Sequence, residues 1–200
     1  MDIVLSTRNP TKALEIKAML ADFTVNVLTL SDAGIQGEAE EDGSSLEENA
    51  EKKVDYAARQ LNTPSWIMAD DSGIFINALN GAPGIHSARW AGETASTEEI
   101  MWFTLKKLEG IQDRFALFRT AIVLQSPEGK KFYFEGITPG KLAESPKAKP
   151  KPAMPYTALF SPAGTQKVLA EMTVEEQKGV SSRGKAIQQV IEFLIGALKN

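Results

Sequence analysis

The stretch Ala69-Asp70-Asp71-Ser72-Gly73 joins two adjacent carboxylates, a hydroxyl and a glycine in consecutive positions. The apolar run before it, 66–68, reads as the end of a buried strand, and a second apolar run follows at 74–76. Burying two adjacent carboxylates is costly unless a cation or a reaction requires them. Since Asp, Ser and Gly are also common turn residues, the pentapeptide is interpreted either as a strand-ending turn or as an active site at the mouth of a sheet.

A second polar stretch, Ser6-Thr7-Arg8-Asn9, lies between a predicted strand at 3–5 and a predicted helix. The helix has Pro10 near its first turn and an apolar stripe that continues to Phe23. Free N–H groups and the dipole of a helix N-terminus bind phosphate, and the side chains of this stretch and of Lys12 can supplement them. The glycines of a Walker loop are missing, so an ordinary capped helix with a solvent-exposed lysine is the alternative.

An acidic stretch before residue 44 leads into another predicted helix. Ser44 or Ser45 caps it, and Glu47 is placed for a capping box with Ser44. The apolar face of this helix consists of Leu46, Ala50, Val54, Ala57 and Leu61. Lys52 and Lys53 lie on or beside its polar side, where solvated side chains are expected in the absence of further evidence.

The rest of the chain mixes strands and helices without strict alternation. Runs at 115–124 and 130–135 predict a hairpin, and 136–143 adds a further strand. Helix starts and a core stripe are marked by Ser96 with Glu99, by Thr173 with Glu176, and by Ile187, Val190, Ile191 and Leu194. Prolines alternate with lysines at 144–152, which indicates an extended, stiff loop from which Lys147, Lys149 and Lys151 project. The pattern predicts an α/β fold with a mixed twisted sheet and flanking helices.

Composition narrows the class of protein. The 200 residues predict one domain, 1–200, and a net charge of −4 argues against general nucleic-acid binding. The absence of cysteine excludes disulfides and thiolate sites, and the single histidine, His86, excludes a histidine-pair metal site. The start lacks a leader pattern and no apolar run approaches a membrane span, so a cytoplasmic protein is expected.

Taken together, these segments resemble the inosine/xanthosine triphosphate pyrophosphatase family, also called the Ham1-like family. The order and spacing of the matching pieces hold along nearly the whole chain. They are Ser6-Thr7-Arg8-Asn9 with Lys12 and Glu15, Glu40-Glu41-Asp42-Gly43, Glu48-Asn49-Ala50 with Lys53, Ala69-Asp70-Asp71-Ser72-Gly73, Gly81-Ala82-Pro83-Gly84-Ile85, Ser87-Ala88-Arg89, Ala91-Gly92, Ala170-Glu171-Met172-Thr173, and Ser181 with Arg183-Gly184.

The resemblance implies an elongated mixed α/β fold with two lobes and a nucleotide in the cleft between them. It also implies a homodimer and a Mg²⁺-dependent attack of water on the α-phosphorus of a nucleoside triphosphate. By the same matching, Asp71 is the base and a metal contact, Glu40 or Glu41 also serves the metal, and Asp70 has no assigned role. The groups that hold the triphosphate would be Ser6, Thr7, Arg8, Asn9, Lys12, Lys53 and Ser72.

The departures from the family pattern gather in the segment that reads the base. The family's stacking aromatic is Met154 here, next to Tyr156, and its aspartate is Thr157. Its lysine is Gln177, and its Ser-His-Arg is Ser181-Ser182-Arg183. Since a purine 6-keto group is best recognised by donors, the loss of lysine and histidine predicts an altered base preference.

The leading hypothesis is therefore a Mg²⁺-dependent nucleoside triphosphate pyrophosphohydrolase whose base preference is altered or relaxed. A catalytically weak relative that binds a nucleotide or a protein, using the lysine-rich loop, is the alternative from another class. A third hypothesis is a pyrophosphatase for modified pyrimidine nucleotides, in the manner of the Maf-like relatives that share the general fold.

Overall fold

The computed structural model describes residues 1–197, which form one seven-stranded sheet with helices packed against it. The strands are β1 Asp2–Leu5, β2 Asn26–Thr29, β3 Trp66–Ile76, β4 Pro83–Gly84, β5 Phe115–Gln125, β6 Lys131–Leu142 and β7 Phe160–Pro162. The α-helices are α1 Pro10–Met19, α2 Leu46–Gln60, α3 Thr97–Lys107, α4 Val174–Lys178 and α5 Ser182–Ala197. Short 3-10 helices are η1 Asn77–Leu79, η2 Ser87–Arg89, η3 Pro155–Ala158 and η4 Leu169–Glu171.

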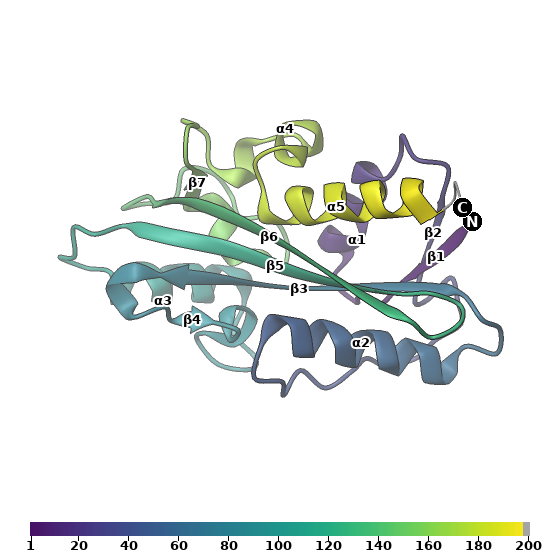
Figure 1. The fold of residues 1–200 in the computed structure, drawn as a ribbon. Helices are drawn as coiled ribbons and strands as arrows, with labels where there is room; N and C mark the ends of the chain where they lie inside the picture. Colours follow the sequence, from purple (N-terminus) through teal and green to yellow (C-terminus); the bar gives the residue numbers. More distant parts are fainter. Residues whose placement is uncertain (198–200) are drawn as a thin grey trace.

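The sheet is mixed, as the sequence predicts. Its order is β2-β1-β3-β5-β6-β7, with β4 paired to β3. β2, β1 and β3 run parallel, whereas β3, β5, β6 and β7 pair in antiparallel fashion. The long hairpin of β5 and β6 extends along the molecule (Figure 1). A separate strand at 136–143 was predicted wrongly, because β5 offers partners along its whole length and β6 continues unbroken to Leu142.

Helices cover both faces of the sheet, α2 on one side and α1 with α5 on the other (Figure 1). One apolar cluster lies beneath α1 and α5, where the predicted stripe of α5 buries Ile187 and Val190. A second cluster lies beneath α2 and includes Val54. A third gathers Ile74 and Phe160 at the other end of β3, β5 and β6, together with α3 and η3. The two predicted lobes are therefore present, and one sheet runs through both.

The pentapeptide 69–73 lies in the middle of β3 and does not interrupt it, so the strand-ending turn is wrong. Its residues pair with β5 without a break, Asp71 opposite Ala121. On the other edge of β3, β1 pairs only as far as Met68 and β4 begins only at Ile74. The pentapeptide therefore occupies a gap in that edge, just beyond the carboxyl end of β1, where ligands of α/β sheets bind.

The helix starts agree with the sequence, and one predicted capping box does not. Ser45 caps α2, since its Oγ accepts a hydrogen bond from Glu48 N at 3.1 Å. The capping box predicted for Ser44 with Glu47 is wrong, because the Glu48 carboxylate accepts the Ser44 N–H and O–H, each at 2.8 Å. The capping boxes predicted for α3 and α4 are confirmed.

Two stretches of irregular backbone follow helices or strands. α1 ends at Met19 and Phe23 packs against the first cluster from the turn beyond it, so the helix is a turn shorter than its apolar stripe. Residues 143–150 form neither helix nor strand, as the alternation of proline and lysine predicts. In the described part of the chain, no helix has both the length and the apolar character that crossing a bilayer requires.

Gly136 allows β6 to pack closely against the first turn of α5. A Cβ at this position would overlap Ser182 O and lie 2.8 Å from Ala186 N. Gly136→Ala should therefore lower the free energy of unfolding by about 1–3 kcal/mol, the usual cost of overpacking. Urea unfolding measures it, with Gly179→Ala as the control, because no atom lies within 4 Å of a Cβ there. Equal stability of the two variants would contradict this packing.

Candidate active site

A cleft of about 450 Å³ opens beside the gap in the edge of β3, and residues of both lobes line it. This volume is within the usual range for a small-molecule site. Glu40 is exposed and lies outside the lining. All the other sequence-predicted site residues line the cleft, namely Ser6, Thr7, Arg8, Asn9, Lys12, Glu41, Lys53, Asp71, Ser72, Met154, Tyr156, Thr157, Gln177, Ser182 and Arg183.

The polar turn between β1 and α1 is held by its own side chains. Asn9 caps α1, and its Oδ1 accepts hydrogen bonds from Thr11 N at 3.0 Å and Lys12 N at 3.2 Å. The sequence predicted that backbone N–H groups at this helix start are free to bind phosphate, but two of them already donate to Asn9 Oδ1. Ser6 is buried, and its Oγ donates to Lys53 O at 2.7 Å, which ties the turn to α2. Lys12 is the charged side chain that this turn and the start of α1 bring to the cleft.

Arg8 lines the cleft, and its guanidinium contacts the loop that precedes α2. Its guanidinium donates to Gly37 O at 2.8 Å, to Ser31 Oγ at 3.1 Å and to Ile35 O at 2.6 Å. These three bonds hold the loop before α2 against the polar turn. Arg8 therefore holds that loop in place at the edge of the cleft, and its role as a phosphate ligand stays a prediction.

Lys53 brings two carboxylates together on the α2 side of the sheet. Its Nζ lies 2.8 Å from Glu41 Oε1 and 2.9 Å from Asp71 Oδ1. Burial disfavours the charged lysine, but the charges of Asp71, Glu41 and Asp70 outweigh it and raise the pKa of Lys53 above its usual value. The solvated helix face expected for Lys53 is therefore wrong, whereas Lys52 is partly exposed. Asn49 Nδ2 donates to the other oxygen of Asp71 at 3.2 Å and fixes its orientation.

Asp70 is fully buried and faces the opposite side of the sheet. Lys12 Nζ and Arg183 Nη2 each lie 3.1 Å from its Oδ2, and Arg183 Nε lies at 3.2 Å. Burial opposes ionisation of the carboxyl, but Lys12, Arg183 and Lys53 outweigh it and hold the pKa of Asp70 well below its usual value. Asp70 therefore orders two cations of the cleft without lining it.

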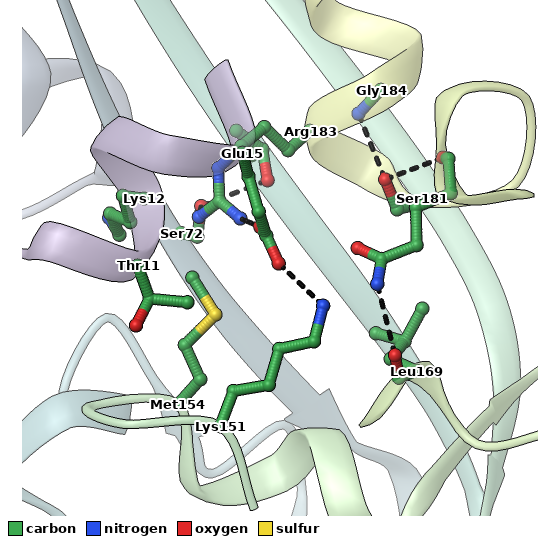
Figure 2. Close-up of polar contacts among 12 residues, drawn as sticks. Thr11, Lys12, Glu15, Ser72, Lys151, Met154, Leu169, Ser181, Arg183 and Gly184 are labelled. Atoms are coloured by element: carbon green, nitrogen blue, oxygen red, sulfur yellow. Dashed lines mark hydrogen bonds and ion pairs between the residues drawn. The ribbon is translucent and has the colours of Figure 1, made fainter. Parts of the chain in front are cut away.

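Glu15 extends this ion-pair network toward the loop at 144–152. Its two oxygens accept from Arg183 Nη1 at 2.7 Å and from Lys151 Nζ at 2.8 Å, and Figure 2 shows both side chains converging on Glu15. Lys147 and Lys149 are exposed, so the predicted projecting row of three lysines is wrong for Lys151, which the buried carboxylate attracts.

The segment after Lys151 bridges the polar turn and the second lobe. Asn9 Nδ2 donates to Ala153 O at 3.2 Å, and Thr11 Oγ1 donates to Pro152 O at 2.8 Å. Ala153 N donates to Thr97 Oγ1 at 3.2 Å, at the start of α3. The segment therefore spans one side of the cleft and contacts both lobes.

Besides Asp70, the site contains three residues to which the sequence reasoning gave no role. Glu15 lies three positions after Lys12 and Asn49 lies four before Lys53, spacings that place side chains on one helix face and were available as a signal. Thr120 is buried in β5, and its Oγ1 lies 2.9 Å from Ser72 Oγ. No pattern in the sequence marks Thr120, because only the sheet register brings it opposite Ser72.

The cleft thus has two parts of different chemistry. The outer part combines Lys12, Lys53, Glu41 and Asp71 and is suited to a polyphosphate with a divalent cation. The inner part is lined by apolar side chains, such as Ile100 and Phe118, and by the residues of the divergent segment. Those polar residues are Tyr156, Thr157, Gln177 and Ser182.

Comparison with known proteins gives a consistent result. The model of the Ham1 family matches residues 3–193. A dITP/XTP pyrophosphatase of Geobacter sulfurreducens is 39% identical over 96% of this chain and 96% of its own. The structure of the Staphylococcus aureus Ham1 protein superposes with a TM-score of 0.81 at 34% identity, covering 98% of this chain and 100% of that one. A HAM1 protein from Coxiella burnetii gives a TM-score of 0.83 at 32% identity, covering 98% and 99%.

The buried ion pairs of Asp70 predict a characteristic pH dependence of stability. The pKa of the folded carboxyl lies below the ordinary value of 3.8, so its ionisation stabilises the fold above about pH 4 and this stabilisation is lost as the pH falls further. Asp70→Asn removes the anion that Lys12 and Arg183 share and leaves Arg183 with Glu15 alone, so it should lower the free energy of unfolding by about 3 kcal/mol at neutral pH.

Urea unfolding between about pH 6 and 3 measures the effect. The difference in the free energy of unfolding between wild type and Asp70→Asn should decrease as the pH falls. Asp22→Asn, which removes an exposed ion pair with Lys178, is the control and should stay close to wild type throughout. A constant difference between wild type and Asp70→Asn across the range would contradict the prediction.

Proposed function

Because the chain belongs to the Ham1 family, we propose that it is a hydrolase that splits nucleoside triphosphates into the nucleoside monophosphate and pyrophosphate. The relatives are named dITP/XTP pyrophosphatases, and we expect the base preference of this chain to differ from theirs, because Gln177 and Ser182 replace the family's lysine and histidine. The observation in favour is the convergence of Glu41, Lys53 and Asp71 beside the polar turn of one cleft. A carboxylate base, a cation and a turn at a helix N-terminus are the groups that phosphoryl transfer uses.

The carboxylates of the outer cleft fit a magnesium ion that arrives with the substrate. Glu41 and Asp71 both contact the same Nζ of Lys53, so their oxygens converge on one position already suited to a cation. Within residues 1–197 no cluster of three or more acidic or histidine side chains is assembled. Magnesium usually takes one or two carboxylates and completes its shell with waters and substrate phosphates, which matches this donor set. We therefore assign Glu41 and Asp71 as ligands, and Glu40, exposed outside the cleft, is not one of them.

When bound, the metal would polarise the phosphoryl oxygens and lower the pKa of the attacking water. Asp71 is placed to accept the proton of that water, since Asn49 and Lys53 hold its two oxygens in a fixed orientation. Water attacks the α-phosphorus, the bond to the bridging oxygen breaks, and pyrophosphate leaves with the electron pair. Lys53 and Lys12 balance negative charge on the phosphates.

The proposal includes the properties that the sequence and the family resemblance led us to expect. We propose that residues 1–200 act as one domain, because one sheet runs through both lobes. A nucleoside triphosphate, rather than nucleic acid, is the ligand of a chain with net charge −4. A homodimer and a cytoplasmic location, where nucleoside triphosphates are consumed, complete the proposal.

Asp71 gives the first test of this function. Asp71→Asn removes the proton acceptor and should reduce pyrophosphate release by a factor of about 10²–10⁴, the usual contribution of general base catalysis. Lys53→Met should also reduce turnover strongly, whereas Lys52→Met, one position away and partly exposed, should leave it near wild type. Coupled detection of pyrophosphate with a broad nucleotide panel measures all three. A wild-type protein that turns over no nucleotide with magnesium or manganese would refute the function.

The two adjacent glutamates provide a matched pair for the metal. Glu41→Gln should raise the Mg²⁺ concentration needed for half-maximal turnover by about tenfold or more, because one of two ligand carboxylates is lost. Glu40→Gln should leave it unchanged, since Glu40 is exposed outside the cleft. Magnesium titration of pyrophosphate release at fixed nucleotide measures both. The reverse pattern would move the metal site to Glu40.

A further inference from the structure

The inner part of the cleft has the form of a nucleobase pocket, and the contacts of its side chains determine which of them donate and which accept hydrogen bonds. Its walls include Ile100, Phe118 and Leu169, whose apolar surface suits a flat heteroaromatic ring. Its polar side chains come from the segment that diverges from the family pattern. The inference below rests on the proposed function, because it assumes that the ligand of the outer part is a nucleotide.

Gln177 can present only an acceptor to a ligand. The side chain is buried, and its Nε2 donates to Leu169 O at 3.0 Å and to Met172 O at 3.2 Å. Two carbonyl oxygens accept from the same nitrogen, and carbonyls cannot donate, so the orientation of the amide is fixed. Both hydrogens are used, and the lone pairs of Oε1 are what this lining residue can offer to a base.

Ser182 is also an acceptor, because a chain of hydroxyls ends on a carboxylate. Ser72 Oγ donates to Asp70 Oδ2 at 3.3 Å, and this carboxylate oxygen, which also contacts Lys12 Nζ and Arg183 Nη2 at 3.1 Å, is an acceptor. Ser72 therefore accepts from Thr120 at 2.9 Å, and Thr120 accepts from Ser182 at 2.8 Å. Each hydroxyl has one hydrogen, so the hydrogen of Ser182 is directed to Thr120 and its lone pairs are left for a ligand.

The other hydroxyls of the inner part have likewise donated their hydrogens. Thr157 Oγ1 donates to Met154 O at 2.7 Å, and Ser181 Oγ donates to the backbone oxygen of Gln177 at 2.8 Å. Tyr156 OH donates to Ser87 O at 2.9 Å. Each of these hydroxyls, like the amide oxygen of Gln177, therefore has lone pairs to offer to a ligand.

We propose that this pocket selects bases with an exocyclic amino group, so that the preferred substrates are aminopurine or aminopyrimidine nucleoside triphosphates. An amino group donates to the lone pairs of Gln177 and Ser182. A keto oxygen in its place would face those lone pairs and leave buried polar groups unpaired, which costs affinity. The preference is opposite to that suggested by the names of the dITP/XTP pyrophosphatases to which the chain is similar.

Two pairs of nucleotides that differ by an amino or a keto group, at purine C6 or at pyrimidine C4, test the inference: ATP with ITP, and CTP with UTP. The kcat/KM for pyrophosphate release should favour the amino member by at least about tenfold in each pair turned over, as expected for about 1.4 kcal/mol. Binding of the corresponding monophosphates, measured by calorimetry, gives the same comparison without catalysis. Turnover with equal or keto preference overturns the inference and leaves the proposed function standing. If no nucleotide is turned over, the proposed function is refuted and the monophosphate affinities test the inference. Absent binding, or tighter binding of the keto member, then overturns it.

Variants of Gln177 separate its acceptor role from simple packing. Gln177→Lys replaces the acceptor by a donor and should shift the amino-to-keto ratio toward the keto member by about tenfold or more. Gln177→Met, of similar volume, should reduce the ratio toward unity without reversing it. Gln188→Lys adds the same charge at an exposed position of α5 and should leave the ratio unchanged. A ratio that stays at the wild-type value in folded Gln177→Met or Gln177→Lys protein overturns the assignment.

Discussion

The structure depends on the burial of two adjacent carboxylates in the middle of one strand. Because successive side chains of a strand point to opposite faces, Asp70 and Asp71 require cations on both sides of the sheet. α1 and α5 supply Lys12 and Arg183 to one side, and α2 supplies Lys53 to the other. Removing one partner of a buried ion pair costs about 3–5 kcal/mol. The contacts that attach three helices to β3 therefore also hold the cations at the proposed polyphosphate site.

The sequence predicted contiguous features of the site and missed those that depend on tertiary contacts. The polar turn and the pentapeptide are local, so their residue types sufficed to mark them. β3 was predicted to break because Asp, Ser and Gly have low strand propensity, and ion pairs with distant helices override that preference. The supporting role of Asp70 was not assigned because Arg183 lies 113 positions further along the chain. The two-lobed mixed sheet, in contrast, followed from the resemblance and from the hydrophobic pattern.

The two parts of the cleft are physically connected. The hydroxyls of Ser72 and Thr120 lead from the Asp70 carboxylate, in the charged network, to Ser182 beside the inner part. Ionisation of Asp70 sets the direction in which every hydrogen of this chain points. The cations that keep Asp70 ionised thereby influence which hydrogen-bonding groups are offered to a base, although none of them lies in the apolar part.

The gap in the edge of β3 has a consequence for the behaviour of the free protein. An unpaired strand edge presents backbone donors and acceptors that invite another strand, and proteins usually block such edges. Here side chains occupy them: Lys53 Nζ donates to Asp70 O at 3.3 Å, and Ile74 N donates to Ser87 Oγ at 2.9 Å. The flanking β1 and β4 leave room for only a few residues, and charged groups surround the opening. The protein can thus keep this edge open beside the proposed substrate site without offering a template for self-association through that strand.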